Sequence, residues 1–323
     1  MDRRDFVRRA AGVPLALALG ARVDAALTAP PRPHALVTAD LESHVVVLDL
    51  ASGETVRRIR TGPGPRSIES SRRRVAVVAH TQHGVVSLIR GVPAAVWKEL
   101  DGFSAPRYTA MHPSVGIAYV TDSSNRDVTA IELGRGRVLW RVDVPGPARH
   151  VSISPDGRSL WTSLGSTAPR IAVLDTEEPR RPRLLGTISP PFLAHDVVFA
   201  PDAGRVWVTS GSDRKVALYR RGSHEPERVV AADAPPQHVA FAGREVFVAS
   251  GDDGTVRRHA LDGTQLGRAR VPLDSYNVTF GFGSIVTPSL GHGTVSILDT
   301  GGRVRVVRRV AEAAHDACIV QLA

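Results

Sequence analysis

The sequence predicts an all-β protein built from seven similar four-stranded units, and three observations lead to this expectation. From residue 34 onward, short runs rich in β-branched residues alternate with Gly, Asp, Asn and Pro, which is typical of short strands joined by turns. No part of this region shows the apolar spacing of an amphipathic helix of useful length. A strand–turn–strand pattern also recurs at a nearly constant period, which indicates a repeat architecture.

Seven strand pairs carry the repeat. They read ALVTADLESHVVVLDL, VAVVAHTQHGVVSLI, IAYVTDSSNRDVTAIEL, LWTSLGSTAPRIAVLD, VWVTSGSDRKVALY, VFVASGDDGTVRRHAL and IVTPSLGHGTVSIL. Each pair is followed by a Gly or Asp turn and a short further strand, for example VRRIRTG. The pairs therefore supply the second and third strands of each unit, and the segment after each pair supplies the fourth.

The first strand of each unit decides how the repeat closes. Six pairs are preceded by a copy of it, and the seventh copy, AHDACIV, lies at the C-terminus. Matching core residues, 39 to 46 residues apart, are Ser70, Met111, Ile153, Phe199, Phe241, Phe280 and Ile319. Because the first pair lacks a first strand, the two chain ends complete one unit if the chain forms a circle. We therefore expect a seven-bladed β-propeller in which the strand 316–322 pairs with residues 36–38.

The third to sixth repeats resemble a known family. The segment AYVTDSSNRDVTAIEL, with HVSISPDG as the first strand of the next unit, is similar to the YVTN-type propeller repeat of secreted bacterial and archaeal proteins. The resemblance covers residues 30–323, and the absence of a Trp-Asp dipeptide makes the chain less like the WD-repeat class. It implies the propeller fold and says little of function, because the repeat is mostly strand and turn.

Residues 1–29 have the layout of a secretory signal peptide. A charged start is followed by an apolar run over residues 10–21, which is too short to span a membrane, and then by small residues. Arg3 and Arg4, followed by Phe6, resemble the twin-arginine export motif. We expect an exported protein, periplasmic or extracellular, with no membrane span in the mature chain.

Composition argues against several other classes of protein. Basic residues outnumber acidic ones by 41 to 32, but the arginines are scattered and only 5% of residues are aromatic, so we expect no nucleic-acid binding. The single cysteine, Cys318, excludes an internal disulfide and a CxxC metal pair, and we expect it to be buried. We expect a monomer. The four tryptophans should pack between blades: Trp97, Trp140, Trp161 and Trp207.

Two residues of each innermost strand are expected at the mouth of the central channel, and nearly all are polar or titratable. The first position reads Arg66, Arg107, Arg149, His195, Gln237, Tyr276 and His315. The second reads Ser67, Tyr108, His150, Asp196, His238, Asn277 and Asp316. Apart from Ser67 and Gln237, we predict that these side chains bind a ligand, because loops on a rigid strand scaffold commonly carry binding sites.

Histidines concentrate on this face of the predicted ring. Eight of the twelve are expected there: His44, His80, His83, His150, His195, His238, His292 and His315. Imidazoles and carboxylates that converge on a channel suit a divalent metal ion, so we predict His195, His238 and His315 as ligands. The dipeptides His195-Asp196 and His315-Asp316 are the sharpest local feature.

The sequence leaves three interpretations of the mouth open. Its polar residues could only join neighbouring blades by hydrogen bonds. They could instead make the protein an exported, non-catalytic scaffold that binds a small ligand, a metal ion or a protein partner. A third possibility is a metal-dependent lactonase- or lyase-like enzyme, with the three histidines as ligands or base and Arg66, Arg107 and Arg149 binding an anion. The predicted mouth contains no Glu, which argues against the enzyme.

Overall fold

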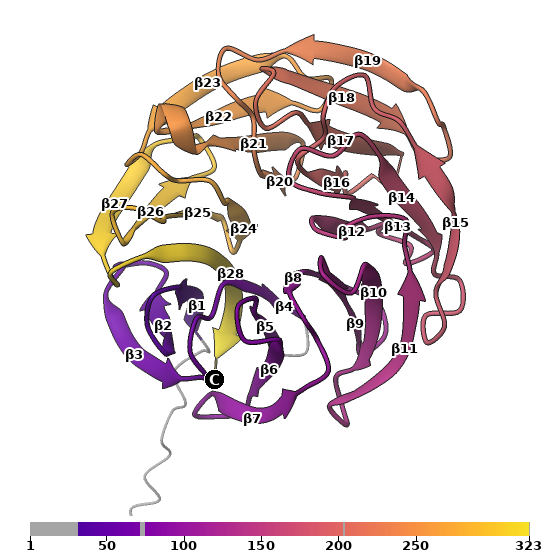
Figure 1. Ribbon diagram of the computed structural model, residues 1–323. Coiled ribbons are helices and arrows are strands. Elements are labelled where there is room, and N and C mark those ends of the chain that lie inside the picture. The colour runs from indigo at the N-terminus through magenta and orange to yellow at the C-terminus, as the bar shows by residue number, and fades with distance from the viewer. Residues whose placement is uncertain (1–31, 72–74, 203, 323) are drawn as a thin grey trace, which may run out of the picture. The chain divides into compact units, whose positions relative to one another are not determined.

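The computed structural model describes residues 32–71, 75–202 and 204–322, and these form the predicted ring of seven four-stranded antiparallel blades (Figure 1). The innermost strands are β28 (Ala314–Leu322), β4 (Ser67–Ser70), β8 (Pro106–Met111), β12 (Val151–Ile153), β16 (Val197–Phe199), β20 (Val239–Ala242) and β24 (Thr279–Gly281). The second strands are β1 (Arg32–Ala39), β5 (Ala76–His80), β9 (Ile117–Asp122), β13 (Ser159–Ser163), β17 (Arg205–Thr209), β21 (Glu245–Ser250) and β25 (Ser284–Ser289).

The outer half of each blade completes the architecture. The third strands are β2 (His44–Asp49), β6 (Val85–Arg90), β10 (Asp127–Glu132), β14 (Ile171–Asp175), β18 (Lys215–Arg220), β22 (Thr255–Ala260) and β26 (Thr294–Asp299). The fourth strands are β3 (Thr55–Arg60), β7 (Ala95–Leu100), β11 (Arg137–Asp143), β15 (Arg183–Ile188), β19 (Pro226–Ala231), β23 (Gln265–Arg270) and β27 (Val304–Arg309). Within the described ranges the one helix is the 3-10 turn η1 (Gly251–Asp253), and no helix is long and apolar enough to cross a bilayer.

The hydrophobic core lies between the blades rather than at the centre of the ring. Each of seven clusters of buried apolar side chains joins two adjacent blades. Strand β1 shows why the second strands are apolar on both faces: Leu36 packs with Ile68 of one neighbouring blade, while Val37 packs with Val286 of the other. Both faces of each blade are therefore buried against its neighbours.

The tryptophans only partly follow the expectation from the sequence. Trp161 and Trp207 are 2% and 0% exposed and pack between blades as predicted. Trp97 is partly buried against one cluster. Trp140 was predicted wrongly: it is 39% exposed on the outer strand β11, where the guanidinium of Arg181 covers its ring at 4.4 Å from the centroid. An outer strand has only one neighbour in its blade, so its side chains reach solvent.

The two chain ends close the ring as predicted (Figure 1). Strand β28 pairs antiparallel with β1, with Leu36 opposite Cys318 and Val37 opposite Ala317. Cys318 is buried in the same core cluster as Leu36, which confirms the expectation of an enclosed thiol. The expected signal peptide lies outside the described residues, so export stays a prediction.

Removing the last ten residues should abolish folding. The deletion takes away β28, and with it the pairing to β1 and the side chains that β28 contributes to two interface clusters. Thermal unfolding followed by circular dichroism should show no cooperative transition, and a peptide of residues 314–323 added in trans should restore one. A truncated protein that melts like the full chain would show that closure is not needed.

Candidate functional site

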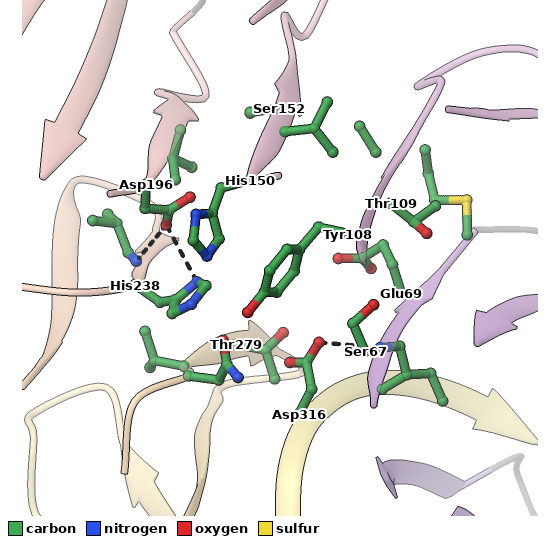
Figure 2. Close-up of a pocket in the computed structure, with 18 of the residues that line it drawn as sticks. Ser67, Glu69, Tyr108, Thr109, His150, Ser152, Asp196, His238, Thr279 and Asp316 are labelled. Atoms are coloured by element: carbon green, nitrogen blue, oxygen red, sulfur yellow. Dashed lines mark hydrogen bonds and ion pairs between the residues drawn. The ribbon is translucent and has the colours of Figure 1, made fainter. Parts of the chain in front are cut away.

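A polar cavity of about 340 Å³ occupies the centre of the ring (Figure 2). All seven residues of the second mouth position line it, each from a different blade: Ser67, Tyr108, His150, Asp196, His238, Asn277 and Asp316. The structure thus brings these residues together where the sequence placed them. Closure of the ring makes this possible, because Asp316 comes from β28 and Ser67 from β4, which are neighbours only in the closed circle.

Three histidines form a compact group at one side of this cavity. His150, His195 and His238 precede the innermost strands β12, β16 and β20 of three consecutive blades. One ring nitrogen from each lies within 4.8 Å of the others. The ring centroids of His150 and His195 are 4.3 Å apart, and those of His150 and His238 are 4.8 Å apart.

Each of these rings has a neighbour at its Nδ1 atom. His195 Nδ1 donates a hydrogen bond to the carbonyl of Ser166 at 2.9 Å. His238 Nδ1 lies 3.5 Å from a carboxylate oxygen of Asp196 (Figure 2). His150 Nδ1 lies 3.4 Å from the Ser163 hydroxyl, and its Nε2 is buried beside the backbone of His195. With Nδ1 of His195 and of His238 engaged in this way, Nε2 is the atom that these two rings would offer a bound ion.

The surroundings favour the neutral form of two of these histidines. Burial is the main cause that lowers the pKa of His195 to about 4, and the neighbouring His238 adds to the shift. Burial also lowers the pKa of His150 well below its usual value, with contributions from His195 and His238. A neutral imidazole can bind a metal ion without first losing a proton.

His315 lies outside the three-histidine group, although the sequence suggested it as a metal ligand. Its Nδ1 donates a hydrogen bond to the carbonyl of Arg66 in the next blade at 2.9 Å. His150 stands in its place beside His195 and His238. His150, His195 and His238 come from three consecutive blades, whereas the blade of β24 separates His315 from His238.

The two His-Asp dipeptides place their aspartates in the same structural role. Asp196 accepts hydrogen bonds from the backbone N–H of Val197 at 2.9 Å and of Val239, in the next blade, at 3.3 Å. Asp316 accepts the equivalent pair from Ala317 at 2.8 Å and from Ile68 at 3.0 Å. These carboxylates join adjacent blades, as the structural interpretation of the mouth expected. Asp196 in addition faces His238.

A repeated threonine also joins blades at this level. Thr209, at the end of β17, accepts the N–H of Asp196 at 3.0 Å and donates to the carbonyl of Gln237 in the next blade at 2.7 Å. Thr38 and Thr121 make the corresponding pairs of bonds in two other blades. All three threonines are fully buried. The V-T dipeptide of the repeat thus holds the mouth residues in position.

Of the remaining predicted residues, Asn277 and Tyr108 line the cavity and Tyr276 does not. Tyr276 donates its hydroxyl to Asp252 and Asp274, each at 3.1 Å, and is not part of the cavity. Asn277 lines the cavity and donates to the carbonyl of His315 in the next blade at 2.7 Å. The ring of Tyr108 lies in the cavity with its centroid 4.3 Å from that of His150 (Figure 2).

The arginines of the first position gather at the mouth instead of in the cavity. Arg66, Arg107 and Arg149 line a small hollow together with Ser67 and Tyr108. Arg66 forms an ion pair with Asp40 at 2.6 Å, and Arg107 donates to the Ser123 hydroxyl at 3.0 Å.

Sequence reasoning missed two residues of the site. Glu69, two positions beyond the mouth on β4, lines the cavity (Figure 2), and burial raises its pKa to about 7. Gly211 lies against His195: a Cβ atom there would be 2.8 Å from the Cβ of His195, and its φ of +71° also favours glycine. The alternation of side chains along β4 could have indicated Glu69, whereas no pattern in the sequence indicated Gly211.

Comparison with known proteins supports the fold. No protein-family model and no curated protein matches the chain. A functionally unknown protein from Desulfotomaculum acetoxidans has a similar structure, with a TM-score of 0.80 and 14% identity over 90% of this chain and 99% of that one. Apo AztD from Citrobacter koseri has a TM-score of 0.67 and 12% identity, over 90% of this chain and 98% of that one. Hydrazine synthase from Kuenenia stuttgartiensis has a TM-score of 0.63 and 19% identity, over 73% of this chain and 77% of that one. The chain is therefore a seven-bladed β-propeller.

Replacing Thr209 with valine should destabilise the protein by about 1–3 kcal/mol, because the change keeps the shape and leaves two buried backbone groups without a partner. Denaturant unfolding measures the loss. Thr55→Val, at an exposed position on β3, is the control and should have little effect. Equal stability of Thr209→Val and the parent would show that the threonine does not join the blades.

Glu69→Gln should change how stability depends on pH. The pKa of Glu69 is raised in the folded protein to about 7 from its ordinary 4.5, so the folded state holds a proton that the unfolded state releases. This group's contribution is therefore full at low pH and is lost as the pH rises toward 7. The free energy of unfolding of the parent should fall relative to that of Glu69→Gln over this range. Parallel curves for the two proteins would contradict the assignment, and the exposed Glu54→Gln is the matched control.

Proposed function

We propose that this protein is a non-catalytic, metal-binding β-propeller that holds a divalent ion such as Zn²⁺ at His150, His195 and His238. The observation that carries the proposal is the convergence of three imidazoles from three consecutive blades, within 4.8 Å of one another. Imidazole is a preferred ligand of Zn²⁺, Cu²⁺ and Ni²⁺, and three ligands leave a coordination position open for a small ligand.

The environment of the rings supports metal binding. A ligating histidine usually gives its other ring nitrogen to a carbonyl or carboxylate, which fixes the orientation of the ring. His195 has such a partner in the carbonyl of Ser166, and His238 faces the carboxylate of Asp196. In a tetrahedral site with bonds of about 2.0–2.1 Å, the ligand nitrogens would be roughly 3.4 Å apart. The three rings would therefore move slightly toward one another as the ion binds.

The assignment of the propeller type rests on the repeat, and the proposal of export rests on residues 1–29. We assign the propeller to the YVTN type from segments such as AYVTDSSNRDVTAIEL. The structural likeness to AztD supports a propeller and is too low in identity to transfer a function. We also propose export, from the twin-arginine-like pair Arg3 and Arg4. A binding protein outside the cytoplasm is consistent with each of these features.

One observation favours the enzymatic alternative. Glu69 supplies to the cavity the glutamate that the predicted mouth lacked, and its pKa of about 7 suits a general base. A metal-dependent lactonase- or lyase-like enzyme could use the three histidines for the ion and Glu69 for proton transfer. Zinc-dependent turnover of a lactone that disappears in Glu69→Gln would favour this alternative.

Single alanine substitutions at His150, His195 and His238 should each weaken zinc binding by more than about 100-fold, because losing even a residue that only supports a ligand costs 10–100-fold. Isothermal titration of the purified protein with zinc, with elemental analysis of the stoichiometry, measures the effect. The parent should bind one ion.

Two histidine variants serve as controls. His224→Ala, at an exposed position, and His315→Ala, at the mouth outside the three-histidine group, should bind zinc as the parent does. Circular dichroism should show that all the variants remain folded. No stoichiometric zinc in the parent, or unchanged binding in the three test variants, would contradict the proposal.

A further inference from the structure

We propose that Arg66, Arg107 and Arg149 form a binding site for a small oxyanion, a carboxylate or a phosphate, at the channel mouth. This site is distinct from the three-histidine group and does not depend on a bound metal. The three guanidinium groups lie close together, two of them lack a paired carboxylate, and some of their hydrogen-bond donors are unused.

The fold places the three arginines side by side. Arg66 directly precedes β4, Arg107 lies at the start of β8, and Arg149 comes just before β12, so they belong to three consecutive blades. Together they line one hollow at the mouth, and no carboxylate is among its lining residues, which are Arg66, Ser67, Thr81, Arg107, Tyr108, Arg149 and His315. Three cationic groups therefore face one another without an anion between them.

Among the described residues, a carboxylate lies within ion-pair distance of only one of the three arginines. Arg66 pairs with Asp40 at 2.6 Å. Within residues 32–71, 75–202 and 204–322, neither Arg107 nor Arg149 has a carboxylate oxygen within 4.0 Å of its guanidinium nitrogens. Arg107 donates only to a neutral hydroxyl, that of Ser123, and the buried Nε of Arg149 has no hydrogen-bond partner. Because the Nε of Arg149 is buried, the Nη groups of Arg107 and Arg149 are the donors that can meet a ligand.

The neighbouring charges already act on one another. Burial lowers the pKa of Arg107, and the positive charges of Arg149 and Arg66 lower it further, while Tyr108 and Asp122 oppose the shift with smaller effects. Arginine nevertheless stays protonated at neutral pH, so this repulsion persists in the folded protein. An anion bound against the three groups would remove the repulsion, and the partly enclosed mouth would strengthen the attraction relative to open water.

The chemistry of the groups specifies the ligand. The planar guanidinium presents parallel N–H donors that match the oxygen pairs of carboxylates and phosphates, and such charged hydrogen bonds are among the stronger ones in proteins. The side chains fill the hollow and leave no space for a water molecule inside it. The anion therefore binds on their outer side, where the side chains of Arg66, Arg107 and Arg149 are each partly exposed.

The test compares two double variants of equal charge. Arg107→Gln/Arg149→Gln removes the two uncompensated cations at the mouth, whereas Arg308→Gln/Arg309→Gln removes two exposed cations of β27 at the outer edge of a blade. Each protein is titrated by calorimetry, as zinc-free protein in low-salt Tris buffer, with inorganic phosphate and separately with citrate. Thermal melts check that both variants are folded.

The parent should bind at least one of the two anions with one-to-one stoichiometry. Binding should weaken by more than about 100-fold in the mouth variant, roughly tenfold or more for each arginine, and should be retained in the outer variant. A preference for phosphate or for citrate identifies the class of ligand. Equal losses in both variants would show attraction by net charge alone and overturn the proposal, as would a parent that binds neither anion. Because no metal is present, these results do not depend on whether the histidines bind zinc.

Discussion

The pairing of β28 with β1 is the interaction on which the rest of the structure depends. Every core cluster lies between two blades, so each blade has a buried face on either side only when the ring is complete. An open ring would expose two apolar blade faces at once, the Val37 face of the first blade and the Val286 face of the last. Strand β28 contributes side chains to two of the seven interfaces between blades, so this one strand completes both.

The same closure builds the site. The cavity is lined by one polar residue from the beginning of every innermost strand, and these residues face one point because seven strands are arranged around it. The polar groups at the mouth form two sets with different structural roles. Asp196, Asp316 and the threonines bond backbone groups of the next blade, which keeps the ring in register. His150, His195 and His238 keep ring nitrogens that the blades do not use.

Much of this could be predicted from the sequence because it follows from periodicity. The blade count, the closing strand and the residues around the cavity all come from aligning one repeat with the next. Contacts across the channel could not be predicted, since they depend on side-chain reach rather than on position in the repeat. His315 donates a hydrogen bond to the backbone carbonyl of Arg66 and does not join His195 and His238. Glu69 lines the cavity although it lies beyond the two mouth positions of its strand. The exposure of Trp140 could have been predicted, because the repeat already places it in the fourth, outermost strand of its blade.

The most direct test of the account is a crystal structure of the zinc-loaded protein with anomalous diffraction measured on both sides of the zinc absorption edge. We expect one strong anomalous peak within about 2.0–2.1 Å of Nε2 of His150, His195 and His238, in a ring closed by β28 and β1. A peak elsewhere, for example at the exposed His224 or between Glu69 and Asp316, or no peak in the ring at all, would contradict the assignment of the metal centre.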